Sequence, residues 1–294
     1  MIPIIKQIKL GYIVCPITKQ RLSFSDGELV SEDKSYKYTL VDGIPVLLKD
    51  KELKVAYFHR SDCVGVNNKS SSINKVYADF IYYIYRMMRR TYPCQNATLA
   101  FEKVISNKDE NALCLSIGGG PGKPHPNLTN VNLFYTNNVD IVGNAYQLPY
   151  ADNVVDSIYC GAVLEHLEFP ADAVQEMYRV LKAGGEVYAV TPFLQELHGS
   201  PSHYQNYTLM GHERLFANHG FMIKESGTHV GPVYMLTNII GVFLLTYLPF
   251  PLNKIIKSIW RVISVFINPL DLFLCKSKDS DTLASTTYVV AIKK

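Results

Sequence analysis

The spacing of apolar residues changes along the chain, and each spacing predicts a different kind of element. Residues 1–50 alternate short apolar runs with Asp-Gly pairs, which is typical of a small β module with tight turns. Apolar residues then recur at helical spacing over 76–90 and over 97–105, which predicts two helices. From residue 112 onward, short apolar runs alternate with helical segments, so a different architecture begins there.

Beyond residue 111, seven short apolar runs are interpreted as strands and one longer segment as a helix. The strands are expected at 112–117, 131–135, 139–142, 156–160, 186–191, 221–225 and 286–292, and the helix at 171–181. Strands that alternate with helices predict an α/β fold, in which helices cover the faces of a mostly parallel sheet. Glu176 and Arg179 are three residues apart on the helix and are interpreted as an exposed ion pair.

The same pattern divides the chain into three regions. We predict a small β module at 1–50, a helical linker at 51–110 and the α/β domain at 111–294. An apolar insert at 233–275 interrupts the last region before its final strand.

The insert has two parts with different chemistry. Residues 233–253 carry no charge, but Pro249 and Pro251 interrupt the run, so we do not expect it to span a membrane. In residues 254–267, four apolar side chains share one helical face and three basic side chains share the opposite face. The apolar four are Ile255, Ile259, Val262 and Phe266, and the basic three are Lys254, Lys257 and Arg261. Such a helix can lie on a membrane surface; the alternatives are that it covers the sheet, caps the active site or forms a dimer.

Composition narrows the class of protein. Among 294 residues, 29 Lys and Arg against 26 Asp and Glu leave a net charge of +3, which disfavours a nucleic-acid partner. With 48% hydrophobic residues, the chain is expected to pack a core. Six cysteines without a C-x-x-C pair, and a start without a secretory signal, predict a reducing cytoplasm, with peripheral membrane contact through 254–267 as an addition.

A glycine-rich turn marks the candidate ligand site. Residues 118–122 read Gly-Gly-Gly-Pro-Gly directly after the first strand of the α/β region. Glycine lets the backbone approach a ligand and tolerates positive φ, although such turns also occur without a ligand. The turn becomes a specific signal only together with an ordered series of segments that follows it. These are Asn144-Ala145, Leu148-Pro149-Tyr150, Leu164-Glu165-His166, Arg179-Val180-Leu181-Lys182 and Gly184-Gly185.

This ordered series, within residues 112–227, resembles the class I S-adenosylmethionine-dependent methyltransferases, specifically the methyltransferase type 11 group. The resemblance implies a Rossmann-like, seven-stranded sheet and S-adenosyl-L-methionine as cofactor. It implies an enzyme that methylates a small-molecule or lipid-like acceptor.

The resemblance also implies roles for individual residues. Gly118, Gly119 and Gly120 would lie against the methionine moiety and ribose of the cofactor. Asn144 and Ala145 would contact the adenine, and Ala162 and Val163 would line the sulfonium end.

Three acidic residues of the family pattern are absent. Ser116 and Asn144 occupy two of these positions, and no acidic residue stands near 134–136, where the family's ribose-binding carboxylate falls. Because a lost charged hydrogen bond costs about 1.5–3 kcal/mol, we expect weakened cofactor affinity. The alternative function is a catalytically degenerate methyltransferase-like scaffold or subunit partner.

Three histidines are the candidate catalytic residues. His166 follows the fourth strand of the α/β region, and His198 and His203 lie in the loop after the fifth. That loop resembles the H-x-x-P-x-D-Y-x-R-[FY]-T segment of a bacterial branch of these methyltransferases. A histidine there could act as general base if the acceptor must lose a proton. The alternative is a loop that anchors itself through its own histidines.

The N-terminal module resembles the zinc-ribbon-like domains related to tRNA-methyltransferase activators. It keeps Cys15-Pro16 and the closing segment 38–48 of that pattern. Structural zinc needs four N or S donors, whereas residues 1–50 contain one cysteine and no histidine. We therefore predict a metal-free module with Cys15 buried, and we predict no metal site elsewhere.

Overall fold

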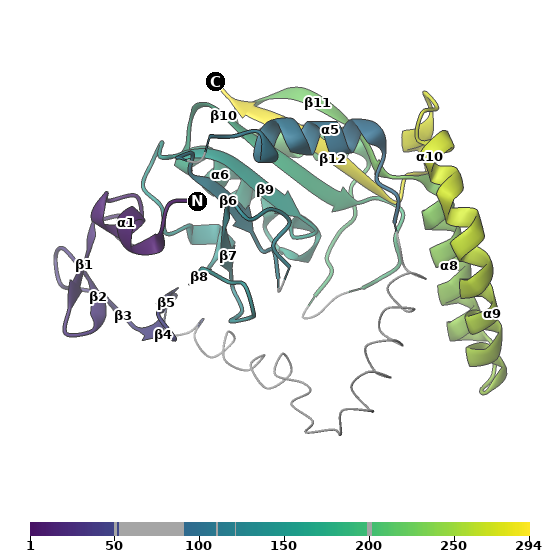
Figure 1. The fold of residues 1–294 in the computed structure, drawn as a ribbon, viewed down its shortest axis with the longest axis horizontal. Helices are drawn as coiled ribbons and strands as arrows, with labels where there is room; N and C mark the ends of the chain where they lie inside the picture. The colour runs from purple at the N-terminus through teal and green to yellow at the C-terminus, as the bar shows by residue number, and fades with distance from the viewer. Residues whose placement is uncertain (50–51, 53–90, 110, 121, 199–201) are drawn as a thin grey trace.

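The computed structural model describes residues 1–49, 52, 91–109, 111–120, 122–198 and 202–294. The predicted helix over 76–90 lies outside these residues. Figure 1 shows a central twisted sheet, a small N-terminal module at one edge and a helical hairpin beside the opposite end.

The sheet has nine strands in the order β11-β12-β10-β9-β6-β7-β8-β5-β4. Their bounds are β4 Leu40–Val41, β5 Ile44–Leu47, β6 Cys114–Ile117, β7 Leu128–Asn132, β8 Ile141–Gly143, β9 Val155–Gly161, β10 Leu181–Pro192, β11 Phe221–Val230 and β12 Thr286–Lys293. Pairing is parallel from β5 to β10, and antiparallel at β4 and around β12. The predicted mostly parallel α/β sheet is confirmed.

Helices cover both faces of the sheet because each presents an apolar stripe to it. On one face α6 (Pro170–Val180) buries Ala173, Val174, Met177 and Val180, beside α7 (Leu209–Ala217). On the other face lie α5 (Gln95–Phe101) and the π-helical segment η1 (Glu102–Ser106), packed against tyrosines of β10 and β12. The predicted helices over 97–105 and 171–181 are therefore confirmed within a few residues.

The second strand of the α/β region lies earlier than the expected 131–135. All five residues of β7 are buried, including Thr129 and Asn130. Asn130 Nδ2 donates to the carbonyls of Gly120 and Asn138, at 3.2 and 3.0 Å. Thr129 Oγ1 accepts from Gln7 Nε2 at 3.1 Å. Because the Asn130 amide group and the Thr129 hydroxyl find these partners inside the protein, both residues sit in a buried strand that a search for apolar runs passes over.

The N-terminal module is joined to the large sheet. It contains α1 (Ile4–Lys9) and a three-stranded sheet of β1 (Leu22–Ser25), β2 (Glu28–Ser31) and β3 (Lys37–Tyr38). Its last strand, β5, pairs in parallel with β8 of the α/β region. Cys15 is buried as predicted, with Sγ 3.1 Å from the Tyr38 hydroxyl.

A polar network ties this module to α6, and the expectation of an exposed Glu176–Arg179 pair is wrong. The Arg179 side chain is 19% exposed and donates to Glu176 at 2.6 Å, to Asp152 at 2.6 Å and to the Tyr150 carbonyl at 2.7 Å. Lys19 of the module lies 3.1 Å from Glu176. The pair is half-buried because Arg179 donates to the Tyr150 and Leu148 carbonyls and because Lys19 of the module packs against Glu176.

The apolar insert forms a helical hairpin. It consists of α8 (Pro232–Tyr247) and α9 (Leu252–Ile267), followed by the short η4 (Asn268–Leu270), α10 (Asp271–Leu274) and η5 (Ser280–Leu283). Asp271 caps the start of α8, with its two carboxylate oxygens accepting from the Val233 and Tyr234 amides at 2.9 Å each. Within the described part of the chain, no helix has both the length and the apolar character needed to cross a membrane.

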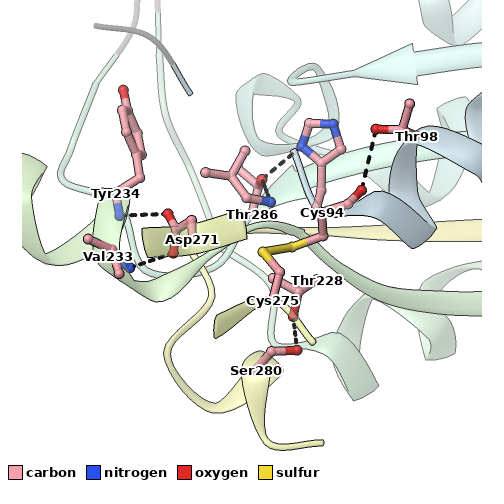
Figure 2. The surroundings of a disulfide bond; sticks show 11 residues. Cys94, Thr98, Thr228, Val233, Tyr234, Asp271, Cys275, Ser280 and Thr286 are labelled. Atoms are coloured by element: carbon pink, nitrogen blue, oxygen red, sulfur yellow. Dashed lines mark hydrogen bonds between the residues drawn. A yellow bond between two sulfur atoms is a disulfide. The ribbon is translucent and has the colours of Figure 1, made fainter. Parts of the chain in front are cut away.

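A disulfide joins Cys94, at the start of α5, to Cys275, just after α10 (Figure 2). The cysteine pattern, which predicts a reducing cytoplasm, does not predict this bond. They are 181 residues apart, so their spacing carried no sign of the bond, and only the tertiary fold brings them together. The bond anchors the returning end of the hairpin insert to the helix that covers the sheet.

We expect Cys94→Ser to lower the melting temperature under non-reducing conditions. Losing the cross-link frees a long loop in the unfolded chain, which costs about 2–4 kcal/mol, or roughly 5–15 °C for a chain of this size. Thermal unfolding followed by circular dichroism measures the shift. The double variant Cys94→Ser/Cys275→Ser should match the single one, and a buried free cysteine, Cys160, is the control. An unchanged melting temperature would contradict the structural role of the bond.

Candidate functional site

The glycine turn after β6 forms one wall of an open cavity. Gly118 and Gly120 have φ values of +66° and +56°, which side-chain-bearing residues rarely adopt. A Cβ atom on Gly118 would lie 2.5 Å from Val163 Cγ2, whereas one on Gly120 would meet nothing within 4 Å. The turn therefore packs against the loop after β9 on one side and leaves space on the other.

The space beside the turn is large enough for a small molecule. The cavity has a volume of about 430 Å³ and is lined by Gly118, Gly119, Gly120, Gly122, Lys123, Pro124, Tyr159, Gly161 and Ala162. It lies at the carboxyl ends of β6 and β9, where strand order reverses. In parallel sheets this crevice is the usual ligand site.

Two buried polar atoms lie at the same turn without a hydrogen-bond partner among the described residues. They are Ser116 Oγ and Asn130 Oδ1. A Cβ on Gly119 would stand 2.6 and 2.9 Å from these two oxygens. Any side chain at position 119 would clash with these oxygens, so the turn needs glycine there.

Asn144 lies after β8, as the family pattern requires, but its amide is already engaged. Asn144 Oδ1 accepts from the Tyr146 amide at 2.9 Å, and Nδ2 donates to Glu52 Oε1 at 2.6 Å. Glu52 follows β5, the strand that pairs with β8. It brings a carboxylate beside the position where the family's acidic residue is missing. The sequence offered no sign of this, because only the β5–β8 pairing places Glu52 there.

The end of β7 holds the third position where the family pattern has an acidic residue. Asn132, the last residue of β7, donates through Nδ2 to the Phe134 carbonyl at 3.1 Å. This bond turns the chain away from the strand and uses the side-chain amide of Asn132. Any contact to a ribose here would be made by neutral groups.

Ala162 and Val163 follow β9 directly, as predicted for the fourth strand. Ala162 has φ +54°, and its amide donates to the Val190 carbonyl of β10 at 3.0 Å. This conformation bends the chain across the carboxyl edge and leads into η3 (Leu164–His166). The predicted cofactor-binding segments after β6 and β9 are thus in contact.

The structure brings the three predicted catalytic histidines together. The ring centroids of His166 and His198 lie 5.5 Å apart, those of His166 and His203 lie 5.8 Å apart, and those of His198 and His203 lie 4.3 Å apart. His203 accepts from the His198 amide at Nδ1 and contacts Asn206 Oδ1 through Nε2 at 2.7 Å. Both ring nitrogens of His203 are therefore used to hold the loop, as the self-anchoring alternative expects for one of the three.

Glu165 is a functional candidate that sequence reasoning missed. Its side chain is 0% exposed, and neither carboxylate oxygen has a hydrogen-bond partner among the described residues. Burial raises the pKa of Glu165 to about 7, and Oε1 lies 3.8 Å from His166 Nε2. In the Leu-Glu-His sequence, Glu165 stands next to the more conspicuous histidine, and nothing local shows that it points inward.

Comparisons with known proteins agree with this geometry. A family model described as a methyltransferase domain matches residues 124–189, which run from Pro124 of the cavity wall into β10. Among curated proteins, none matches the chain.

Three similar solved structures illustrate the range of such matches. The [4+2]-cyclase SpnF is 17% identical, with 68% of this chain and 80% of that chain covered and a TM-score of 0.45. Phosphoethanolamine N-methyltransferase 2 of Haemonchus contortus is 15% identical, with coverage of 67% and 52% and a TM-score of 0.42. A Haloferax volcanii complex of the Trm112 methyltransferase activator and a putative methyltransferase is 14% identical, with 67% of this chain and 88% of that chain covered and a TM-score of 0.41.

The α/β region forms the predicted mostly parallel sheet, and the glycine turn borders a cavity where the strand order reverses. The family model matches the segment that follows this turn. The chain carries a methyltransferase domain of the S-adenosylmethionine-dependent class.

Proposed function

We propose that this protein transfers the methyl group of S-adenosylmethionine to a lipid-like acceptor at a membrane surface. The observation that carries the acceptor class is the exposed apolar surface of the α8–α9 hairpin. A soluble small-molecule acceptor would give no reason for such a surface beside the site.

Both helices of the hairpin turn apolar side chains outward. On α9 the predicted apolar face is 47–79% exposed, and its members are Ile255, Ile259, Val262 and Phe266. On α8 a second stripe is 40–72% exposed, and its members are Leu236, Ile239, Phe243 and Tyr247. Two stripes of exposed apolar side chains on one hairpin indicate an interaction site. It also argues against the alternative that α9 covers the sheet.

Basic side chains accompany this apolar surface. Lys254 is exposed and lies 5.3 Å from the ring centroid of Phe250 at the tip of the hairpin. Lys257 and Arg261 lie on the same helix but line the space between α9 and α8, together with Thr237 and Asn238. Helices that lie on anionic membranes place their apolar side chains in the acyl boundary and keep Lys and Arg near the headgroups.

The hairpin is linked to the loop that carries the histidines. Asn238 of α8 donates through Nδ2 to Glu196 Oε2 at 2.6 Å, and the Glu196 carbonyl contacts His198 Nδ1 at 2.9 Å. A membrane under the hairpin would therefore lie close to the acceptor side of the site. This link supports an acceptor that reaches the histidines from the lipid phase.

The residues around the cavity fit the uncharged parts of the cofactor. The glycine turn would hold the methionine and ribose portions, and Ala145 with the Asn144–Glu52 pair would face the adenine. S-adenosylmethionine supplies an electrophilic methyl group on sulfur. The protein positions the acceptor and excludes water around it. His166 lies on the acceptor side of the site and would help to position the acceptor.

The degenerate-scaffold alternative is favoured by one observation, the three family carboxylates absent from this chain. At one of those positions, Glu52 supplies a carboxylate beside Asn144. The two functions differ in whether the cofactor binds and in whether methyl groups are transferred.

We expect methyl-labelled S-adenosylmethionine to transfer label to the lipid-extractable fraction of isolated membranes incubated with the protein. Scintillation counting of the organic and aqueous phases measures this. His166→Ala should reduce transfer while cofactor binding persists, because His166 lies on the acceptor side. Label recovered only in the water-soluble fraction would replace the lipid-like acceptor by a soluble one.

We expect the protein to sediment with vesicles of phosphatidylcholine and phosphatidylserine, and less strongly at high salt. The variant Ile259→Ser/Phe266→Ser should weaken binding at least about tenfold, because each apolar side chain contributes roughly 1.5–3 kcal/mol when buried. Phe24→Ser, which changes an exposed apolar residue of β1, is the matched control. Equal binding of all three proteins would contradict the role of the hairpin.

We expect S-adenosylhomocysteine to bind with a Kd of roughly tens of micromolar, because neutral groups replace charged ones. Gly120→Val should abolish binding, since its side chain would enter the cavity without clashing with the protein. Gly184→Val is the control, because Gly184 also has positive φ (+76°) and open space around it. Isothermal titration calorimetry measures both. If both variants still bind S-adenosylhomocysteine, the cofactor does not bind at the glycine turn.

A further inference from the structure

We propose that Glu165, His166 and His198 form a binding site for a divalent transition-metal cation at the acceptor side of the cavity. One ligand atom from each of the three side chains lies within 4.8 Å of the others. Two imidazoles and one carboxylate are a donor set suited to Zn²⁺, Fe²⁺ or Mn²⁺.

The two histidines are oriented as metal ligands are. His166 Nδ1 contacts the Ser202 carbonyl at 2.5 Å, and His198 Nδ1 contacts the Glu196 carbonyl at 2.9 Å. A carbonyl only accepts, so each Nδ1 carries the proton and each Nε2 presents a lone pair. Metal-binding histidines are usually fixed in this way, by donating the other ring N–H to a carbonyl or carboxylate.

The carboxylate supplies an independent observation. Glu165 is fully buried, neither of its oxygens has a hydrogen-bond partner among the described residues, and Oε1 lies 3.8 Å from His166 Nε2. Burying a carboxylate without a partner costs several kcal/mol. A cation between Glu165 and the two Nε2 atoms would give this carboxylate the partner that the protein does not.

The position of the cluster indicates what the cation would do. Ala162 lines the cavity, and η3, which carries Glu165 and His166, begins two residues later. Three protein ligands leave coordination positions open for oxygen atoms of another molecule. We therefore infer an acceptor with a hydroxyl group that binds the cation, an inference that rests on the proposed methyl transfer.

Such an acceptor would react as an oxygen nucleophile, because a bound cation makes the hydroxyl easier to deprotonate. The hydroxyl proton passes to water, and an oxygen lone pair forms the new O–CH₃ bond. The electron pair of the broken C–S bond stays on the sulfur of S-adenosylhomocysteine.

The sequence-based prediction of no metal site depended on local spacing. His198 lies on the loop after β10, whereas Glu165 and His166 follow β9, so no short motif contains the three ligands. The parallel pairing of β9 with β10 brings the two loops to the same edge of the sheet.

Titration of the metal-free, full-length protein with Co²⁺ tests the site without any need for activity. We expect one equivalent to bind and to give the visible d–d absorption of cobalt in a low-symmetry protein site. His166→Ala and His198→Ala should each weaken Co²⁺ binding at least about tenfold. His219→Ala is the matched control, because His219 Nδ1 also contacts a backbone carbonyl, that of Leu215, away from the cluster. No absorption, or equal loss in the control, would overturn the site.

Glu165→Gln separates a metal ligand from a merely structural residue. As it removes an unpaired buried charge, we expect it to raise the melting temperature of the metal-free protein and to abolish the stabilisation by Co²⁺. A lowered melting temperature with Co²⁺ binding intact would overturn the assignment of Glu165.

The acceptor class has its own test. Catechol, a probe that offers two adjacent oxygens, should change the absorption of the Co²⁺-loaded protein. An unchanged spectrum would overturn the hydroxyl acceptor and leave the cation site standing. Failure of methyl transfer to lipid, with Co²⁺ binding intact, would instead count against the proposed function alone.

Discussion

The reversal of strand order between β6 and β9 is the constraint on which the rest of this protein depends. The chain leaves β6 toward β7 on one side, while β9 lies on the other, so the loops after the two strands diverge at the carboxyl edge. The glycine turn then packs against Val163, and the loops after β9 and β10 bring the histidines together. The cavity beside the glycine turn, Glu165 and the histidine cluster share one edge because parallel strands all end there.

The insert shows how a nearly uncharged segment is held to a polar framework. Asp271 satisfies two amides at the start of α8, and Trp260 Nε1 donates to the Thr237 carbonyl across the hairpin at 2.8 Å. These bonds, with the disulfide from Cys275, fix the hairpin at its base. The hairpin can therefore keep its apolar faces outward without depending on them for its own packing.

Sequence patterns predicted the parts of the fold that depend on local periodicity. The apolar run of β6 and the stripe of α6 are where they were expected, because both bury one kind of side chain. The strand β7 lies earlier than predicted, because it buries the polar residues Thr129 and Asn130, whose bonds to Gln7 and to the Gly120 carbonyl no apolar pattern contains. Glu52, Glu165 and the Cys94–Cys275 bond follow from tertiary pairing, and no local pattern contains them. The predicted histidines converged because the strand order alone was enough to place their loops.

The docking of β5 against β8 has a consequence for how copies of this protein meet one another. Without β5, the backbone groups of β8 would be open to pairing with a strand from another molecule. Among the described residues, that edge of the sheet now ends in the two-residue β4. The opposite edge, β11, is interrupted by register shifts and carries Lys224 and Glu225. A short strand at one end and an irregular, charged strand at the other make poor templates for edge-to-edge aggregation. The N-terminal module thus closes a sheet edge that would otherwise be open to another strand.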